Sequence, residues 1–251
     1  MQANAIDDLV TLYEQTKMVG WDFSRLSGRM TVDDTPWDFD ADCLAEMRRA
    51  SSLVDLGTGG GERLCRLLAA VPPGERRVAA TEGWAPNFPV AQGNLTPLGV
   101  DVVSYDIDRG EPLPFEDSSL DLVMSRHEAI DISEAARVLV PGGRLLSQQV
   151  HGRDAEEIHL WFDEEFLFPD ATPERYAADL EAAGVRVDAM DEWQGTRVFT
   201  DVEALVVYLA LVPWDAPNFD VRRNERRLAE LDANRPIRVS QRRFRVAATK
   251  Q

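Results

Sequence analysis

The stretch from Leu53 to Glu62, Leu-Val-Asp-Leu-Gly-Thr-Gly-Gly-Gly-Glu, constrains the fold more than any other part of the chain. An apolar run and an acid come first, four glycines follow within five positions, and a helical pattern begins near Glu62. This order predicts a buried strand, a tight turn and a helix N-terminus. Glycines let a backbone approach a ligand closely, and the first N–H groups of a helix have no partner inside it. We therefore expect a nucleotide to bind at this turn.

Strand and helix patterns alternate after the glycine turn. The predicted helices are 61–70, 86–98 and 131–139, and the predicted strands are 52–56, 77–81, 101–105, 120–125 and 144–150. Alternation of this kind predicts an α/β fold with a mostly parallel sheet and helices on both faces. Ligands of such sheets bind beyond the carboxyl ends of the strands.

The patterns outside this central region are less regular. Helices are predicted at 4–19, 40–50, 173–183, 202–211 and 220–233, and strands at 185–191 and 237–248. We expect residues 1–50 to form an N-terminal helical cap or lid and residues 51–150 to form the ligand-binding core. Residues 151–251 then complete the sheet and carry an insertion and a basic C-terminal segment.

The charge is unevenly distributed along the 251 residues. The formal net charge is −17, although residues 220–251 contain nine Arg and one Lys against four acids. A chain this acidic is unsuited to holding nucleic acid by broad electrostatics. The basic segment either pairs with the acidic body or forms a partner surface. No secretion signal or membrane-length apolar run is visible, so we expect a cytoplasmic protein that does not bind membranes.

The spacing around the glycines excludes two nucleotide classes. A dinucleotide-binding turn requires Gly or Ala three residues after the second glycine, and Glu62 stands there. A phosphate-binding P-loop requires Gly-Lys-Ser/Thr, which is absent. Cys43 and Cys65 form no metal-ligand spacing, and we expect both to be reduced packing residues and the site to hold no metal.

Two acids and one helix–turn–strand pattern indicate which class of nucleotide the glycine turn binds. Glu82 ends the second strand of the series, where a carboxylate can accept hydrogen bonds from both hydroxyls of a ribose. Asp106 ends the third strand, and residues 134–145 predict a helix, a Pro-Gly-Gly turn and a strand. In this order and spacing, residues 50–150 resemble the class I S-adenosylmethionine-dependent methyltransferases, in particular the type 11 group.

The resemblance implies a Rossmann-like methyltransferase fold with an antiparallel last strand, and S-adenosyl-L-methionine as the cofactor. It implies that Glu82 holds the ribose, with Gly83 and Trp84 lining that end. It places the methionine part against the turn, and adenine and the reacting methyl group against two further strand ends. The residues implied for these parts are Asp55, Gly57, Thr58, Gly59 and Gly61 for methionine, Asp106 and Ile107 for adenine, and Arg126 and His127 near the methyl group.

Methyl transfer from a sulfonium is an in-line displacement, and a base is needed only if the acceptor loses a proton. His127 with Glu128 is the first candidate for that base because the pair follows the fourth strand, and His151 after the fifth strand is the second. The alternative role of these residues is to shape the cofactor pocket. Four aromatic residues of the irregular segments are candidates for the substrate side or for ordinary packing, namely Trp21, Trp37, Trp161 and Tyr208.

Three functions are consistent with these features. The acidity and the aromatic segments favour a small-molecule methyltransferase. An RNA methyltransferase using the segment from Arg222 to Arg245, and a non-enzymatic cofactor-binding module, are the alternatives. The sequence leaves the methyl acceptor, the methylated atom and the choice between monomer and homodimer open.

Overall fold

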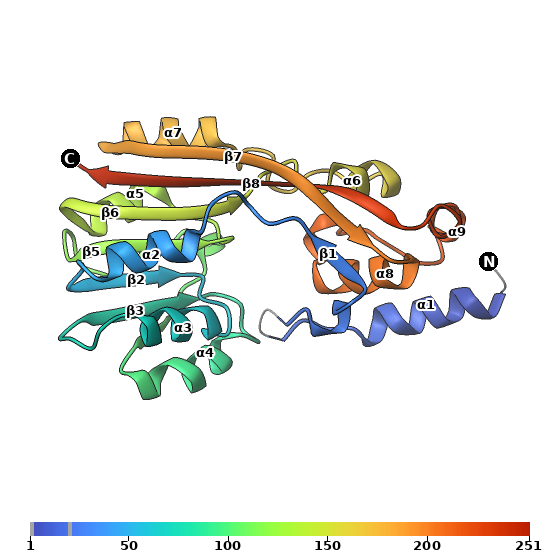
Figure 1. The fold of residues 1–251 in the computed structure, drawn as a ribbon, viewed down its shortest axis with the longest axis horizontal. Coiled ribbons are helices and arrows are strands. Elements are labelled where there is room, and N and C mark those ends of the chain that lie inside the picture. The colour runs from blue at the N-terminus through green and yellow to red at the C-terminus, as the bar shows by residue number, and fades with distance from the viewer. Residues whose placement is uncertain (1–2, 20–21) are drawn as a thin grey trace. The chain divides into compact units, whose positions relative to one another are not determined.

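The computed structural model describes residues 3–19 and 22–251 (Figure 1). Trp21, one of the predicted substrate-side residues, lies outside the described residues. The chain divides into two compact units, each built from three segments. The core unit comprises Pro36–His151, Asp170–Glu192 and Arg243–Gln251, and the second unit comprises Met1–Thr35, Gly152–Pro169 and Trp193–Arg242. Each unit has its own buried apolar core, so we describe them one at a time.

Five parallel strands form the centre of the core unit: β2 (Ser52–Leu56), β3 (Arg77–Glu82), β4 (Asp101–Ser104), β5 (Leu120–Arg126) and β6 (Leu139–Val150). The strand β8 (Ile237–Lys250) pairs antiparallel with β6. The full hydrogen-bonding order is β1-β7-β8-β6-β5-β2-β3-β4. The predicted Rossmann-like sheet with an antiparallel last strand is confirmed.

Helices cover both faces of this sheet (Figure 1). The helices α2 (Phe39–Met47), α3 (Glu62–Ala70) and α4 (Phe88–Leu95) pack on one face, and α5 (Ile132–Val138) and α7 (Pro173–Ala182) pack on the other. The strands β2 and β5 contribute apolar side chains to both cores, which is why their sequences read as continuous apolar runs. Side chains of Asp38, Asp131 and Thr172 cap the N-termini of α2, α5 and α7.

The second unit is built around α8 (Val202–Leu211), which is almost entirely buried. Around this helix its core includes residues of α1 (Ala3–Gln15), α6 (Glu156–Phe162) and α9 (Glu225–Ala233). The short strand β1 (Met30–Val32) pairs antiparallel with the end of β7 (Val185–Phe199). Four short 3-10 segments complete the described secondary structure of the chain, at Ser24–Leu26, Thr96–Leu98, Ile107–Arg109 and Pro213–Asp215.

Several predicted boundaries of helices and strands are wrong. The strand β6 already begins at Leu139. Pro141, Gly142 and Gly143 are part of this strand, where its pairing with β5 is irregular, and they do not form a turn before it. The strand β7 runs to Phe199, eight residues beyond its predicted end, and its last part pairs with β1, which the sequence did not predict. The helix α9 starts at Glu225 because residues before it form turns.

The course of the chain through the sheet determines where a ligand can bind. The chain passes from β2 outward to β3 and β4, and then returns to the opposite side of β2 as β5 and β6. Loops on the two sides of β2 therefore diverge at its carboxyl end and leave a crevice there. The glycine turn predicted to bind a nucleotide lies at this point, between β2 and α3.

Candidate active site

The carboxylate of Asp55, just before the glycine turn, is buried and has two side-chain partners. Asp55 is 4% exposed, and its carboxylate accepts a hydrogen bond of 2.9 Å from the Thr58 hydroxyl. The Arg63 guanidinium lies 3.5 Å from its other oxygen. Burial raises the pKa of Asp55, and Arg63 and Thr58 oppose that rise by stabilising the charged form. Asp55 thus ties the end of β2 to the first turn of α3.

Arg63 extends this connection to a second helix. Its guanidinium donates to Asp40 at 2.7 Å and to the Cys43 sulfur at 3.2 Å, and it lies 5.2 Å above the Phe39 ring. All three partners are on α2. An arginine of the α3 helix therefore fixes α2 beside the glycine turn, in addition to pairing with Asp55.

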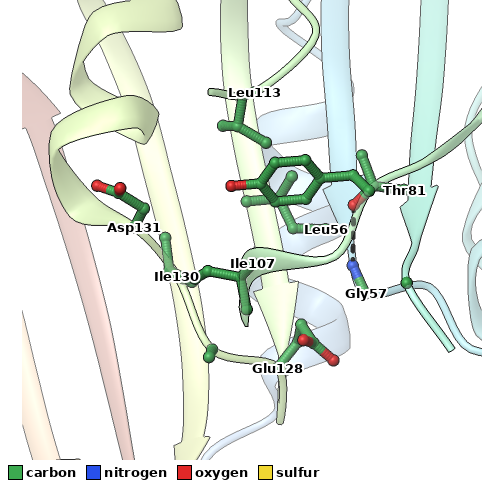
Figure 2. Close-up of a pocket in the computed structure, with 11 residues that line it drawn as sticks. Leu56, Gly57, Thr81, Ile107, Leu113, Glu128, Ile130 and Asp131 are labelled. Atoms are coloured by element: carbon green, nitrogen blue, oxygen red, sulfur yellow. Dashed lines mark hydrogen bonds between the residues drawn. The ribbon is translucent and has the colours of Figure 1, made fainter. Parts of the chain in front are cut away.

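Two glycines are required by close contacts. Gly57 has a φ of +62°, and a Cβ there would lie 2.1 Å from the Glu128 side chain. Its N–H donates to the Thr81 hydroxyl at 3.2 Å (Figure 2). A Cβ on Gly83 would lie 2.6 Å from the carbonyl oxygen of Tyr105. The absence of side chains therefore keeps the turn open at Gly57 and brings the ends of β3 and β4 together at Gly83.

Glu82 lies at the end of β3 beside the glycine turn. It is 5% exposed, and its carboxylate accepts a 2.8 Å hydrogen bond from the N–H of Trp84. Burial raises the pKa of Glu82, and backbone N–H groups of Trp84, Gly59 and Gly83 oppose the rise. These contacts leave acceptor capacity on a buried carboxylate, which is what binding the hydroxyls of a ribose requires. The Trp84 side chain itself is 44% exposed.

Asp106 and Ile107 begin the loop after β4. One oxygen of Asp106 accepts from the N–H of Asp108 at 3.1 Å, and the other lies 3.3 Å from Arg109. The carboxylate thereby caps a short 3-10 turn and gives Ile107 a fixed position. Ile107 lines a pocket beside the glycine turn (Figure 2).

This pocket has mostly apolar walls and two acids, Glu128 and Asp131 (Figure 2). Asp131 caps the helix α5 by accepting from the N–H of Glu134. The Glu128 backbone is fixed because its carbonyl oxygen accepts from the Gln149 amide at 2.8 Å and from the Ser125 hydroxyl at 3.1 Å. Burial raises the pKa of Glu128 to about 7, and the negative charges of Glu82, Asp108 and Asp106 add to the rise. The other residues of the lining are Leu56, Gly57, Thr81, Gly83, Tyr105, Ile107, Leu113, Ala129 and Ile130.

His127 is held away from regular strand geometry. Its φ is +63°, and its N–H donates to the Gln148 carbonyl oxygen at 2.7 Å. The Gln148 amide nitrogen lies 3.0 Å from His127 Nε2, and the Gln148 amide oxygen accepts a 2.7 Å hydrogen bond from the Trp37 indole. The preceding residue, Arg126, is exposed at the end of β5.

Four of the predicted site residues line this pocket, Gly57, Gly83, Ile107 and Glu128, and the other described ones do not. His151 is buried at the end of β6, with Nε2 3.7 Å from Glu192 and its ring edge against Phe244. Trp161 and Tyr208 belong to the second unit, where both pack in its apolar core. The substrate-side roles of Trp37, Trp161 and Tyr208 therefore stay predictions.

Sequence reasoning missed several residues that shape the site. Arg63 lies in an amphipathic helix eight residues after Asp55, and nothing in the sequence distinguishes it from Arg66 of the same helix. Gln148 and Gln149 interrupt the apolar strand 145–150, and two neighbouring amides in a buried strand predict a polar network. Tyr105, Leu113 and Ile130 line the pocket from loops, where no periodic pattern marks them.

Comparison with known proteins agrees with this arrangement. A family model described as a methyltransferase domain matches residues 54–147. Residues 54–147 are a class I S-adenosylmethionine-dependent methyltransferase domain. The cofactor of this domain is S-adenosylmethionine. A search among curated proteins finds no significant match to the chain.

Solved structures share the fold of this methyltransferase at low identity. A putative methyltransferase from Bacillus halodurans is 17% identical, with a TM-score of 0.57, over 85% of this chain and 99% of that one. A putative sarcosine dimethylglycine methyltransferase from Galdieria sulphuraria is 16% identical, with a TM-score of 0.53 and coverages of 84% and 83%. A geranyl diphosphate methyltransferase solved in complex with SAM is 14% identical, with a TM-score of 0.51 and coverages of 85% and 83%.

Within residues 3–19 and 22–251, no three His, Cys, Asp or Glu side chains are grouped so that they could hold a metal ion. The helices of the same residues are all too short or too polar to cross a membrane.

Replacing Gly83 with Ala should disrupt both the fold and the cofactor site. The added Cβ would meet backbone atoms of Tyr105 and Asp106, which cannot rotate away. We expect a loss of about 1–3 kcal/mol in the free energy of unfolding and at least a tenfold weaker affinity for S-adenosylhomocysteine. Urea unfolding and calorimetry measure the two effects. Gly93→Ala is the matched control, because a Cβ there meets open space; equal behaviour of the two variants would contradict the packing argument.

Proposed function

We propose that this methyltransferase transfers the methyl group of S-adenosylmethionine to a small-molecule acceptor. The observation that carries the proposal is the pocket beside the glycine turn, in which apolar walls surround the carboxylate of Glu128. Two structural neighbours are described as methyltransferases of sarcosine and dimethylglycine and of geranyl diphosphate, which are small molecules. The shared fold serves many acceptors, so these names support a class of acceptor and no particular compound.

The charges of the chain support the same class of acceptor. Arginines of the basic C-terminal segment are paired with acids of their own unit: Arg226 and Arg227 with Glu230, Arg222 with Asp7, and Arg245 with Asp191. Side chains neutralised in this way attract phosphates weakly. The acidic body repels nucleic acid in addition. These pairings disfavour the alternative of an RNA methyltransferase.

The chain holds the cofactor through the groups at the ends of three strands. The buried carboxylate of Glu82 would accept from the ribose hydroxyls, and Ile107 would contact the adenine ring. The backbone at Gly57 and Gly59 would pass close to the methionine part. The bound cofactor supplies an activated methyl group on a sulfonium cation. Negative charge at Glu82, Asp106 and Glu128 favours a cation in this crevice.

Glu128 is the residue best placed to take a proton from the acceptor. Its side chain lies against Gly57 in the pocket, and its pKa of about 7 matches a base that works near neutral pH. A hydroxyl or ammonium acceptor bound beside Glu128 and the methyl group would lose its proton to this carboxylate as its oxygen or nitrogen attacks the methyl carbon. His151 lines no part of the pocket and is the weaker candidate for this role.

Glu82→Ala should weaken the binding of S-adenosylhomocysteine by roughly 10- to 100-fold. The variant removes the carboxylate that would accept hydrogen bonds from the ribose hydroxyls. A hydrogen bond to a charged group contributes about 1.5–3 kcal/mol. Titration calorimetry measures the affinity, and circular dichroism verifies the fold. The control is Glu116→Gln, an exposed acid that is not part of the pocket lining. An unchanged affinity in Glu82→Ala would remove Glu82 from the cofactor site.

Glu128→Gln should stabilise the chain at alkaline pH. Because the pKa of Glu128 is raised from 4.5 to about 7 on folding, the folded state binds the proton more tightly than the unfolded state. The free energy of unfolding therefore falls as pH rises from about 4.5 to about 7, by up to roughly 3 kcal/mol. Urea unfolding at pH 5 and pH 8 should show this fall in the parent chain and a smaller fall in Glu128→Gln. Glu116→Gln should keep the full pH dependence; identical slopes in all three proteins would contradict the burial of Glu128.

The acceptor class is tested by measuring S-adenosylhomocysteine formation with a panel of small amines, carboxylates and hydroxyl compounds, and separately with total RNA. We expect turnover with a member of the small-molecule panel and none with RNA. Reversing the charges of Arg226 and Arg227 to Glu should leave turnover unchanged, since neither residue lines the pocket. Turnover with RNA alone, declining steeply with salt, would overturn the proposal.

A further inference from the structure

Trp37, Gln148 and His127 form a directional hydrogen-bond chain in the core unit. The indole N–H of Trp37 donates to Gln148 Oε1 at 2.7 Å. An indole nitrogen has a hydrogen to give and no lone pair to accept with. The atom of the Gln148 amide that faces Trp37 must therefore be the oxygen, and the amide nitrogen must face the other way.

The amide nitrogen faces the imidazole of His127. Gln148 Nε2 lies 3.0 Å from His127 Nε2. An amide NH2 group only donates, so His127 Nε2 must accept and cannot carry a hydrogen. A neutral imidazole has one N–H, and here it must be on Nδ1. The direction of the first hydrogen bond thus determines the tautomer of a residue two contacts away.

Each member of the chain is held in place. Gln148 is 4% exposed, so water does not compete for its amide. Arg245 lies 5.2 Å above the Trp37 ring and is itself paired with Asp191 and Asp42, which orients the indole. The backbone of His127 is bonded to the same Gln148, which holds it at a φ of +63° that non-glycine residues rarely adopt.

We propose that Trp37 and Gln148 are positioning residues that fix His127 as the neutral tautomer with its hydrogen on Nδ1. In this state His127 has no available lone pair, and it does not serve as the general base. For catalysis, this tautomer leaves Glu128 as the member of the pair that can remove a proton, and that consequence rests on the proposed function. The tautomer of His127 does not depend on the proposed function.

The test is the tautomer of His127 in the ligand-free chain at pH 8, from long-range 15N–1H couplings of the imidazole. The chain contains three His, and His127→Asn assigns the signals. We expect Nδ1 to be the protonated nitrogen and Nε2 to be unprotonated. In Trp37→Phe the Gln148 amide is released to turn over, so His127 should shift to a mixture or to the Nε2–H form. Trp84→Phe, which changes an exposed indole, should leave the tautomer as in the parent chain.

The variant Gln148→Glu gives a second, independent test of the tautomer of His127. A carboxylate only accepts, so His127 should then carry a hydrogen on Nε2. Amide correlation spectra verify that each variant is folded. An Nε2–H tautomer in the parent chain overturns the proposal, and so does an unchanged tautomer in whichever of Trp37→Phe and Gln148→Glu folds. Because no cofactor or acceptor is present, a failure of methyl transfer would not affect this result.

Discussion

The burial of the Asp55 carboxylate is the constraint on which the site depends. A charge at 4% exposure needs partners, because its transfer from water is costly. Thr58 and Arg63 supply them, and in doing so they fix the glycine turn and the first turn of α3. Arg63 then needs partners of its own, which it finds on α2. One buried acid thus joins a strand, a turn and two helices around the crevice.

The core of the fold was predictable because its signals are local. Apolar runs, glycines and strand-end acids are all marked within short stretches, and the structure places β2, β3, β4 and β5 within a residue of their predicted bounds. The length of β7 was not predictable, because its last part is stabilised by pairing with β1, more than 150 residues away. The proline and two glycines at 141–143 suggested a turn, but β6 runs through them, and its pairing with β5 is irregular there.

The candidate site also has features that the sequence could predict and features that it could not. The positions of Glu82, Gly83 and Ile107 beside the glycine turn could be predicted, because parallel strands bring the residues at their carboxyl ends together. The state of each group could not be assigned, because it depends on tertiary contacts. The sequence named His127 and Glu128 together as the first candidate for a base, because the pair follows the fourth strand of the series. In the structure, burial and neighbouring acids raise the pKa of Glu128 to about 7, while Gln148 faces the ring of His127.

The interleaving of the two compact units has a consequence for how this enzyme can change over evolution. Each unit is assembled from three separate segments, and β7 and β8 continue from one unit into the other. Two of the boundaries fall inside strands, one in β7 and one in β8, and neither unit corresponds to a contiguous piece of the coding sequence. The second unit cannot be exchanged by a single recombination event, as an appended domain could be. We expect new acceptor preferences in such a chain to arise by substitutions and loop insertions.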